Sequence, residues 1–408
     1  MYSAKHCSTL GSATLLSLML AVPTAFAAPP SKPVAAKGQV ITTTDLDTNN
    51  DGTVDSRGIF TRGYDTKGRL VRDAVESDAP VDGTIDSSRV ITYQYDKAGK
   101  LTLETEISTD GGMSRRSTVA SIYDGGGYLI RQVSETDDTG DGTVDVRSAT
   151  TYANDARGNV LVQMTSVDLG ANGSIDAVSK VTSTYNQAGW RVSMVSEGDS
   201  PVDNVADYRI RTTFTYDEAG HLLEEATEVD LDANGSIEST DHTVHTYDAG
   251  GREVMSLHES DDNGDGTLSL RAISTHTYGA LGELLESTSD LDQAAIFGGA
   301  IDGTIDVSTS ATFRYDAAGN KVEQVVDEQV GLLLKRERST FVYDADGHVV
   351  SSTFTVELDR VVVLEQTVAN AYNSRGQLVQ SVSTLDDDGD GLVDSSTVSR
   401  TVYDGVRR

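Results

Sequence analysis

Cysteine, proline and tryptophan are scarce in this sequence of 408 residues, which contains one Cys, six Pro and one Trp. A single cysteine cannot form an internal disulfide bond, so the fold must be held by other means. Basic residues are also few: 32 Lys and Arg face 64 Asp and Glu, for a formal net charge of −32. Because nucleic-acid binding rests on cationic contacts to phosphate, this balance argues against nucleic acid and, equally, against an anionic membrane surface as a partner.

The first 27 residues have the pattern of a signal peptide. Lys5 precedes an apolar run over 15–22, and Ala25-Phe26-Ala27 is a small-x-small cleavage site. The cysteine, Cys7, lies inside this segment, and the apolar run is short for a bilayer span. We expect a secreted or cell-surface protein, with the periplasm as another compartment, and no membrane span in the mature chain. The predicted parts are a signal peptide at 1–27, a Pro/Ala-rich leader at 28–37 and one repeat domain of about twelve units at 38–408.

The rest of the chain repeats one pattern: a strand-like run that ends in Tyr-Asp, then two variable residues, then Gly. Successive Tyr positions are 31 residues apart in seven of eleven steps, and the other steps are 28, 28, 29 and 37 residues. A period in this range is the mark of a repeat architecture. The positions are Tyr64, Tyr95, Tyr123, Asn154 (in place of Tyr), Tyr185, Tyr216, Tyr247, Tyr278, Tyr315, Tyr343, Tyr372 and Tyr403.

Each unit predicts two strands. The runs are short, rich in Val, Thr, Tyr and Ser, and bounded by turn residues, which is typical of strands. Asp suits the first position of a type I turn, and Gly tolerates the positive φ of a hairpin turn such as 186–189. Twelve units give about 24 strands, with hairpin turns at one rim and acidic loops at the other. A sheet of that size must curl or close.

The acidic loops follow the pattern Asp-x-Asx-x-Asx-Gly-x-x-Asp. Oxygen ligands at alternate positions before a Gly turn resemble the first half of a calcium loop, because Ca²⁺ takes six to eight oxygen ligands. We therefore expect several calcium ions. The candidate ligands are Asp47, Asn49, Asp51, Asp55, Asp137, Thr139, Asp141, Asp145, Asp168, Asn172, Asp176, Asp230, Asp232, Asn234, Glu238, Asp261, Asn263, Asp265, Asp386, Asp388, Asp390 and Asp394.

These loops differ from EF-hands, since position twelve lacks Glu and the flanks read as strands. They look more like the loops of thrombospondin type 3 repeats or dockerins. Their smaller number of carboxylate ligands implies affinities of roughly 10⁻⁴ to 10⁻³ M. The competing interpretation is an acidic turn with no ion, because Asp, Asn and Gly are common turn residues. Pro80 and Pro201 stand where a ligand should be, so weak or absent binding is expected there. Near Asp110, Val330 and Asp359 the motif is absent, which suggests plain hairpin connections.

The strings 92–101, 213–222 and 313–319 resemble the YD repeat of Rhs-type proteins. The resemblance covers about residues 39–405 and implies a long curled antiparallel sheet that spirals into a shell. The alternative is a six-bladed β-propeller. A lipid-facing barrel is disfavoured, because strands such as Lys100–Glu106 carry little apolar surface on either face.

The two ends of the repeat domain are complementary half-units. Residues 37–40 resemble the start of a second strand, and Tyr403 ends a first strand. We therefore expect the terminal strands to pair, either within one molecule or head to tail between molecules.

No nucleophile elbow, zinc-protease helix or phosphate-binding Gly loop is present, so an enzyme is not expected. His242, His245, His258 and His276 could meet on a sheet, but scattered surface histidines are the favoured interpretation. The function expected from these patterns is an exported, calcium-binding structural or adhesive repeat protein. The alternative is a module that binds carbohydrate or a cell-surface protein through the Tyr rows or through the loop 293–300, where Ile296 and Phe297 stand.

Overall fold

The computed structural model describes residues 38–294 and 301–404, and all of its regular elements are strands. The predicted signal peptide, the leader and the Ile296-Phe297 segment lie outside the described residues. Within the described ranges no helix has the length and apolar character needed to cross a bilayer.

The strands match the two-strand repeat that the sequence predicts. Their bounds are β1 (Gly38–Asp47), β2 (Ser56–Tyr64), β3 (Leu70–Asp78), β4 (Ser87–Tyr95), β5 (Leu101–Asp110), β6 (Met113–Tyr123), β7 (Leu129–Asp137), β8 (Val146–Asn154), β9 (Val160–Leu169), β10 (Ala177–Tyr185), β11 (Arg191–Asp199), β12 (Tyr208–Tyr216), β13 (Leu222–Asp230), β14 (Ser239–Tyr247), β15 (Glu253–Asp261), β16 (Leu270–Tyr278), β17 (Leu284–Gln293), β18 (Val307–Tyr315), β19 (Lys321–Val330), β20 (Leu333–Tyr343), β21 (Val349–Leu358), β22 (Val361–Tyr372), β23 (Leu378–Asp386) and β24 (Ser395–Asp404).

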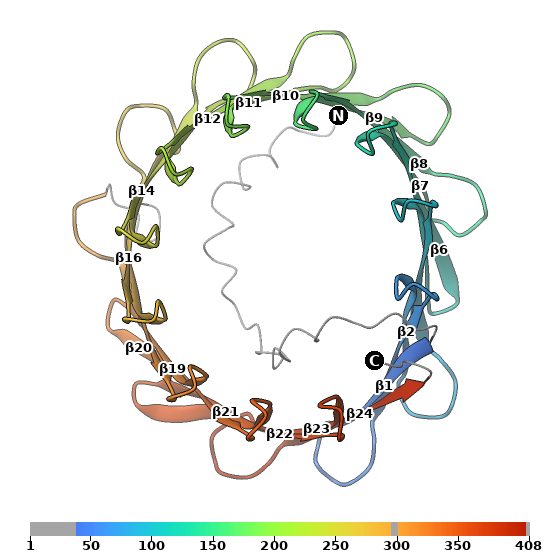
Figure 1. Ribbon diagram of the computed structural model, residues 1–408, viewed down its shortest axis with the longest axis vertical. Helices are drawn as coiled ribbons and strands as arrows, with labels where there is room; N and C mark the ends of the chain where they lie inside the picture. The colour runs from blue at the N-terminus through green and yellow to red at the C-terminus, as the bar shows by residue number, and fades with distance from the viewer. Residues whose placement is uncertain (1–37, 295–300, 405–408) are drawn as a thin grey trace.

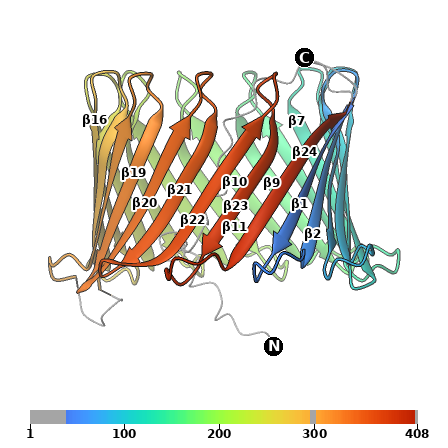
Figure 2. The ribbon, with the colours of Figure 1, turned by 90° about the horizontal axis from the view of Figure 1, so that it is seen from below.

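The strands form one closed antiparallel barrel. Each strand pairs with the next along the chain, and β1 pairs with β24 from Gln39↔Asp404 to Asp47↔Ser396. Figure 1 shows the resulting ring and Figure 2 its tilted wall. The expected open spiral is therefore wrong, because both end strands have partners. The propeller alternative is wrong too, since a propeller separates its strands into blades and this ladder is continuous.

Closure follows from the complementary half-units at the two ends. β1 supplies the second strand that β24 lacks, and the pairing of the terminal strands within one molecule is confirmed. Side chains reinforce this seam, because Thr42 Oγ1 bonds to Thr401 Oγ1 at 2.9 Å and Thr44 Oγ1 bonds to Ser399 Oγ at 2.9 Å. A closed barrel has no exposed sheet edge, which removes the main aggregation hazard of a long repeat sheet.

The short turns at one rim are built by the Tyr-Asp-x-x-Gly pattern. In the turn after β2, Gly68 N donates to Asp65 O at 3.0 Å, and Asp65 N donates to Arg69 O at 2.9 Å. Gly68 has φ +76°, a conformation that costs other residues energy. A register shift falls at the last residue of the even strand, as at Gly63/Tyr64. The sequence thus predicts these turns correctly, because their chemistry is local.

The repeated tyrosines join neighbouring hairpins along this rim. In ten of the eleven repeated tyrosines the hydroxyl donates to the carbonyl of the first residue of the preceding odd strand, at 2.8–3.0 Å. Asn154, which replaces Tyr in the pattern, makes the same bond from Nδ2 to Leu129 O at 2.9 Å. The donors and acceptors are Tyr95–Leu70, Tyr123–Leu101, Tyr185–Val160, Tyr216–Arg191, Tyr247–Leu222, Tyr278–Glu253, Tyr315–Leu284, Tyr343–Lys321, Tyr372–Val349 and Tyr403–Leu378.

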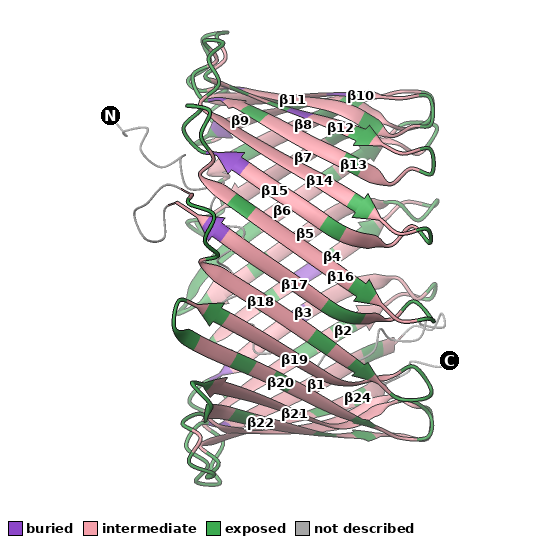
Figure 3. Ribbon diagram, turned by 90° about the vertical axis from the view of Figure 1, so that its left-hand side faces the viewer, coloured by how far each residue is buried: buried purple, intermediate pink, exposed green. Residues whose placement is uncertain are grey.

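The barrel wall is one layer thick and has two faces, which we name from β12. The tyrosine face carries Ile210, Phe214 and Tyr216, and the arginine face carries Arg209 and Arg211. Among the described residues only two apolar side chains are buried, Ala74 and Ile91, so most of the wall is half-exposed (Figure 3). The structure therefore rests on its hydrogen-bond ladder and on cross-strand side-chain pairs rather than on a hydrophobic core.

Charged residues occupy both faces in mid-strand. Arg211 and Lys180 stand at the fourth residue of β12 and β10 on the arginine face. Glu225 lies opposite Phe214, and Glu337 lies opposite Val356, on the tyrosine face. Ion pairs of 2.6–3.3 Å also cross the arginine face, namely Arg57–Asp45, Arg147–Glu135, Arg209–Glu197, Arg271–Glu259 and Arg336–Asp327.

Candidate functional site

Almost all of the excess negative charge lies at one rim. Nine loops, which we call the acidic rim, contain 29 of the 64 acidic residues and none of the 32 basic residues, so the rest of the chain is nearly neutral with 35 acids and 32 bases. The described parts of these loops lie outside the ring of strands, whereas the short turns of the other rim lie inside it (Figures 1 and 2). The loops are 47–55, 78–86, 137–145, 168–176, 199–207, 230–238, 261–269, 292–306 and 386–394.

The first acid of each loop holds the loop backbone. Numbered from this residue, position 1 accepts the N–H of position 6 at 2.7–3.1 Å in the eight nine-residue loops, and in the longer loop 292–306 Asp292 accepts the N–H of Gly303 at 2.7 Å. In the first loop the bond runs from Gly52 N to Asp47 Oδ2 at 2.8 Å. Several of these acids are buried, with Asp168 and Asp230 each 3% exposed. Position 1 therefore has a structural role with or without an ion.

The last acid closes the loop. Position 9 accepts the N–H of position 2, as from Thr48 N to Asp55 Oδ2 at 2.8 Å and from Leu231 N to Glu238 Oε2 at 2.7 Å. Ser269 Oγ replaces the acid in one loop and accepts the N–H of Asp262 at 3.1 Å. The two proline loops keep this closure, so the scaffold survives where the ligand pattern does not.

The acid at position 5 is held by the residue at position 7. Thr143 donates from both N and Oγ1 to Asp141 Oδ1, at 2.8 and 2.5 Å. Hydrogen bonds from the Thr hydroxyl and then from its N–H lower the pKa of Asp51, Asp141 and Asp265 below the ordinary value of 3.8. These carboxylates are therefore ionised at neutral pH, which is the state that a metal ion requires.

Position 3 decides which loops gather carboxylates. In 230–238 the ligand oxygens of Asp230, Asp232 and Glu238 lie within 4.8 Å of one another. In 386–394 those of Asp386, Asp388 and Asp394 do the same. Both loops have Asp at position 3, and the structure brings these six predicted residues into two clusters.

The other predicted loops have no third carboxylate at this place. In the first loop Asn49 turns toward its neighbour, with Nδ2 donating to Asp51 Oδ2 at 3.1 Å. Asn263 makes the same bond to Asp265 at 3.1 Å. Position 3 is Thr139 in one loop and Gly170 in another. These loops offer fewer charged ligands than the two clusters.

The loop 386–394 has the highest acid density of the rim. Five of its nine residues are Asp. A hydrogen bond shared with Asp394, together with its negative charge, raises the pKa of Asp387. Burial acts in the same direction on Asp386, but the N–H groups of Gly391, Gly389 and their neighbours outweigh it, so the pKa of Asp386 is lowered. Like charges crowd this loop, and a cation would relieve that repulsion.

Three connections lack the acidic motif and are tight hairpins, as the sequence suggests. Asp110 pairs with Met113, and Val330 pairs with Leu333, across two-residue turns. The third connection joins Leu358 to Val361. The acidic loops are thus insertions into plain hairpins.

The tyrosine row is not a free platform for a ligand. The residue after the turn Gly covers the Tyr ring of the next unit in several hairpins: Arg69 lies 4.6 Å from the Tyr95 ring, and Trp190 lies 5.4 Å from that of Tyr216. The hydroxyls donate to backbone carbonyls, as described above. Rings and hydroxyls are therefore engaged in holding the rim.

The four histidines that the sequence singles out do not converge on one point. His245 Nδ1 and His276 Nε2 both face the Glu253 carboxylate, at 2.9 and 3.8 Å. His258 bonds to a threonine of β14 at 3.0 Å, and His242 pairs with a glutamate of β13 at 2.7 Å. Sequence reasoning missed Glu253, because only the strand register places it between two histidines.

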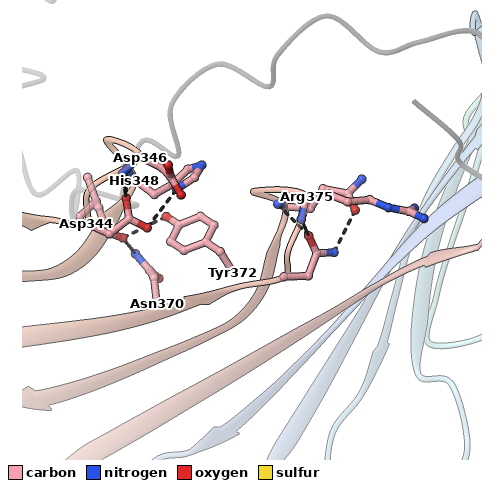
Figure 4. Close-up of polar contacts among 9 residues, drawn as sticks. Asp344, Asp346, His348, Asn370, Tyr372 and Arg375 are labelled. Carbon is pink, nitrogen blue, oxygen red and sulfur yellow. Dashed lines mark hydrogen bonds and ion pairs between the residues drawn. The ribbon is translucent and has the colours of Figure 1, made fainter.

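Sequence reasoning also missed a cluster in a short turn. The ligand atoms of Asp344, Asp346 and His348 lie within 4.8 Å of one another (Figure 4). The sequence signal for this cluster is the acid at Asp346, because the corresponding residue of the other short turns is Lys, Arg, Leu, Ala or Gly.

No protein-family model and no curated protein matches this chain. Among solved structures the chain is similar to the crystal structure of TcdB2-TccC3 without the hypervariable C-terminal region, with 13% identity and a TM-score of 0.22 over 84% of this chain and 24% of that chain. A porin-like protein from Bacteroides uniformis has 9% identity and a TM-score of 0.23, over 90% of this chain and 97% of its own. Salmonella typhi OmpF in complex with daunomycin has 8% identity and a TM-score of 0.14, over 91% and 98%.

This chain therefore spans about a quarter of the TcdB2-TccC3 chain (24%). With TM-scores this far below 0.5, these structures support no assignment of fold or function to this chain. The YD-repeat resemblance stays a prediction, and the closed barrel corrects the spiral that it implied.

Proposed function

We propose that the protein is an exported, non-catalytic structural barrel whose acidic rim binds calcium ions. The observation that carries this proposal is the convergence of three carboxylates at positions 1, 3 and 9, in Asp230/Asp232/Glu238 and in Asp386/Asp388/Asp394. Ca²⁺ prefers such oxygen ligands and completes its shell with backbone carbonyls and water.

The charge distribution supports the same proposal. The acidic rim has 29 acids and no Lys or Arg, so no side chain within these loops can neutralise it. Fixed charge of one sign destabilises a compact state through self-repulsion. A divalent cation that joins carboxylates within one loop removes this repulsion where it is strongest.

The backbone scaffold leaves room for an ion. At position 1 of the loop 230–238, Oδ2 accepts Gly235 N at 2.9 Å and Oδ1 accepts Asn234 N at 3.0 Å, yet each carboxylate oxygen has a second lone pair. Sites of this kind, with few carboxylates, suit affinities of about 10⁻⁴ to 10⁻³ M, which match extracellular calcium. An exported protein would meet such concentrations, and this agrees with the predicted signal peptide.

Calcium titration by calorimetry tests the proposal. We expect saturable binding in the wild type and its loss from the two clustered loops in the double variant Asp232→Asn/Asp388→Asn. A matched control is Asp82→Asn, which removes an acid from a loop with Pro at position 3 and should leave the calorimetric signal unchanged. Wild-type protein that binds no calcium at 10 mM, or a double variant that binds as the wild type does, would refute the assignment.

A further inference from the structure

We propose that the short turn 344–348, on the rim opposite the acidic loops, is a site for a transition-metal ion of the Zn²⁺ class, held by Asp344, Asp346 and His348. The site lies between β20 and β21, and Figure 4 shows the three side chains gathered beside Tyr372. It is separate from the proposed calcium loops in position, in ligand chemistry and in sequence motif.

The turn holds its donors in place before any ion arrives. Asp344 N donates to His348 O at 2.9 Å, and Asp344 Oδ1 accepts the N–H groups of Asp346 and His348, each at 2.9 Å. Gly347, with φ +82°, permits the tight bend. The three donor side chains therefore come from five consecutive residues whose backbone is fixed by hydrogen bonds.

The imidazole is fixed as well. His348 Nδ1 lies 3.0 Å from Asp344 Oδ2, and the ring stacks on that of Tyr372 with centroids 4.6 Å apart. Tyr372 is itself held by its hydroxyl bond to Val349 O at 2.9 Å. Two ligands of one tetrahedral Zn²⁺ ion lie about 3.3 Å apart, given bonds of about 2.0 Å. A shift of a few tenths of an ångström thus brings His348 Nδ1 and Asp344 Oδ2 to the separation of two ligands of one ion.

The ligand set indicates the class of metal. Imidazole suits Zn²⁺, Cu²⁺ and Ni²⁺, whereas Ca²⁺ and Mg²⁺ take oxygen ligands. The turn also borders an open hollow of about 550 Å³, whose lining includes Asp344, Asp346, Asp316 and Ala318.

Comparison with the other turns isolates the residue that makes the site. The turn 217–221 has the same Asp and His, with His221 Nδ1 at 2.7 Å from Asp217 Oδ2 and its ring stacked on Tyr247 at 4.9 Å. In this turn Ala219 takes the position that Asp346 has in the turn 344–348. The Asp–His pair thus recurs in a second turn, whereas Asp346 has no counterpart there. Hydrogen bonds in the turn 344–348 run to the Asp344 carboxylate, from the N–H groups of Asp346 and His348 and from the His348 ring.

This pair of turns allows a test by loss and by gain. Zn²⁺ alone is titrated by calorimetry into the full chain in 10 mM CaCl₂, so that the acidic rim is already occupied. We expect one site in the wild type, at least tenfold weaker binding in Asp346→Ala and in His348→Gln, and a second site of similar affinity in Ala219→Asp. Circular dichroism of each variant checks that the barrel is folded.

Co²⁺ supplies an independent readout, because its visible absorption bands report the ligand geometry. The bands should decrease in Asp346→Ala and should increase about twofold in Ala219→Asp. The proposal is overturned by absence of zinc binding in the wild type, by an unchanged affinity in Asp346→Ala, or by a stoichiometry in Ala219→Asp that equals that of the wild type.

Discussion

The substitution Gly220→Ala tests how the rim is held together. Gly220 has φ +95°, and a Cβ added there would lie 2.6 Å from Cζ2 of Trp190, which belongs to the preceding hairpin. Gly319 is the matched control: it has φ +86° in an equivalent turn, and no heavy atom lies within 4 Å of its added Cβ. The pair separates backbone strain from displacement of the ring.

The expected costs follow from these contacts. Alanine in a left-handed conformation costs about 1–2 kcal/mol, and Gly319→Ala should lose only this amount of unfolding free energy. Gly220→Ala must also move Trp190 away from Tyr216, whose ring centroid lies 5.4 Å away. An aromatic pair contributes about 0.5–1.5 kcal/mol beyond burial, so the total for Gly220→Ala should be about 1.5–3.5 kcal/mol.

The assay uses the single tryptophan of the chain, Trp190. Urea unfolding followed by its fluorescence gives the free energies, and the folded-state emission should shift to the red in Gly220→Ala but not in Gly319→Ala. In a Trp190→Ala background, followed by circular dichroism, Gly220→Ala should cost no more than Gly319→Ala. Equal costs of the two glycine substitutions in the wild-type background would refute the idea that the ring of one hairpin packs on the turn of the next.

Four further outcomes are expected. Tyr95→Phe removes the hydroxyl bond to Leu70 O (2.8 Å) and should lower the unfolding free energy in urea by about 1 kcal/mol, whereas no change would deny the tyrosine a structural role. Calcium at 10 mM should raise the Tm by about 3–6 °C, because it would occupy two sites with dissociation constants of about 10⁻⁴ to 10⁻³ M. A Tm that calorimetry finds unchanged by calcium would contradict this prediction. The pKa of Asp51 and of Asp141 is lowered from 3.8 in the folded state, so the contribution of these carboxylates to stability is present above pH 4 and is lost as the pH falls below it. The urea concentration at the unfolding midpoint, measured in calcium and high salt, should therefore drop from pH 5 to pH 3. A rise would count against the hydrogen bonds to these two carboxylates. Deletion of residues 38–47 removes β1, exposes the edges of β2 and β24, and should give oligomers in gel filtration, whereas a stable monomer would show that closure is dispensable.

The repeating hairpin could be predicted from the sequence because its determinants lie within a few residues. Asp65 and Gly68 form their turn through contacts that span four positions, and each later copy does the same. The two rims follow from the same alternation of turn and loop. The three shortened units become plain hairpins, since removal of the loop leaves the flanking strands in register.

The closed barrel could not be predicted with the same security. A spiral and a barrel use the same hairpins and differ only in the stagger between strands, summed over the whole sheet. The resemblance to YD repeats favoured the spiral, and that prediction is wrong. The complementary ends at Gly38 and Tyr403 pointed to pairing but left open whether it joins one molecule or two.

The candidate sites also differ in whether their residues are close in the sequence or meet only through strand pairing. The acids at positions 1, 3 and 9 are within nine residues of one another, so the sequence predicts their proximity, as in Asp230, Asp232 and Glu238. The cluster of Asp344, Asp346 and His348 is equally local, but it lies in a short turn and does not share the motif of the acidic loops. In contrast, Glu253 meets His245 and His276 only through the pairing of three strands.

The sequence by itself determined the strands, the turns and the placement of acids on the loops, because each depends on neighbours along the chain. It also determined that one rim would carry the charge, since 29 acids fall in the same phase of the repeat. Only the tertiary structure decided that β1 meets β24 and that the tyrosine of one hairpin bonds to the backbone of the preceding strand. Those contacts depend on the curvature and register of the whole wall, which no single repeat encodes.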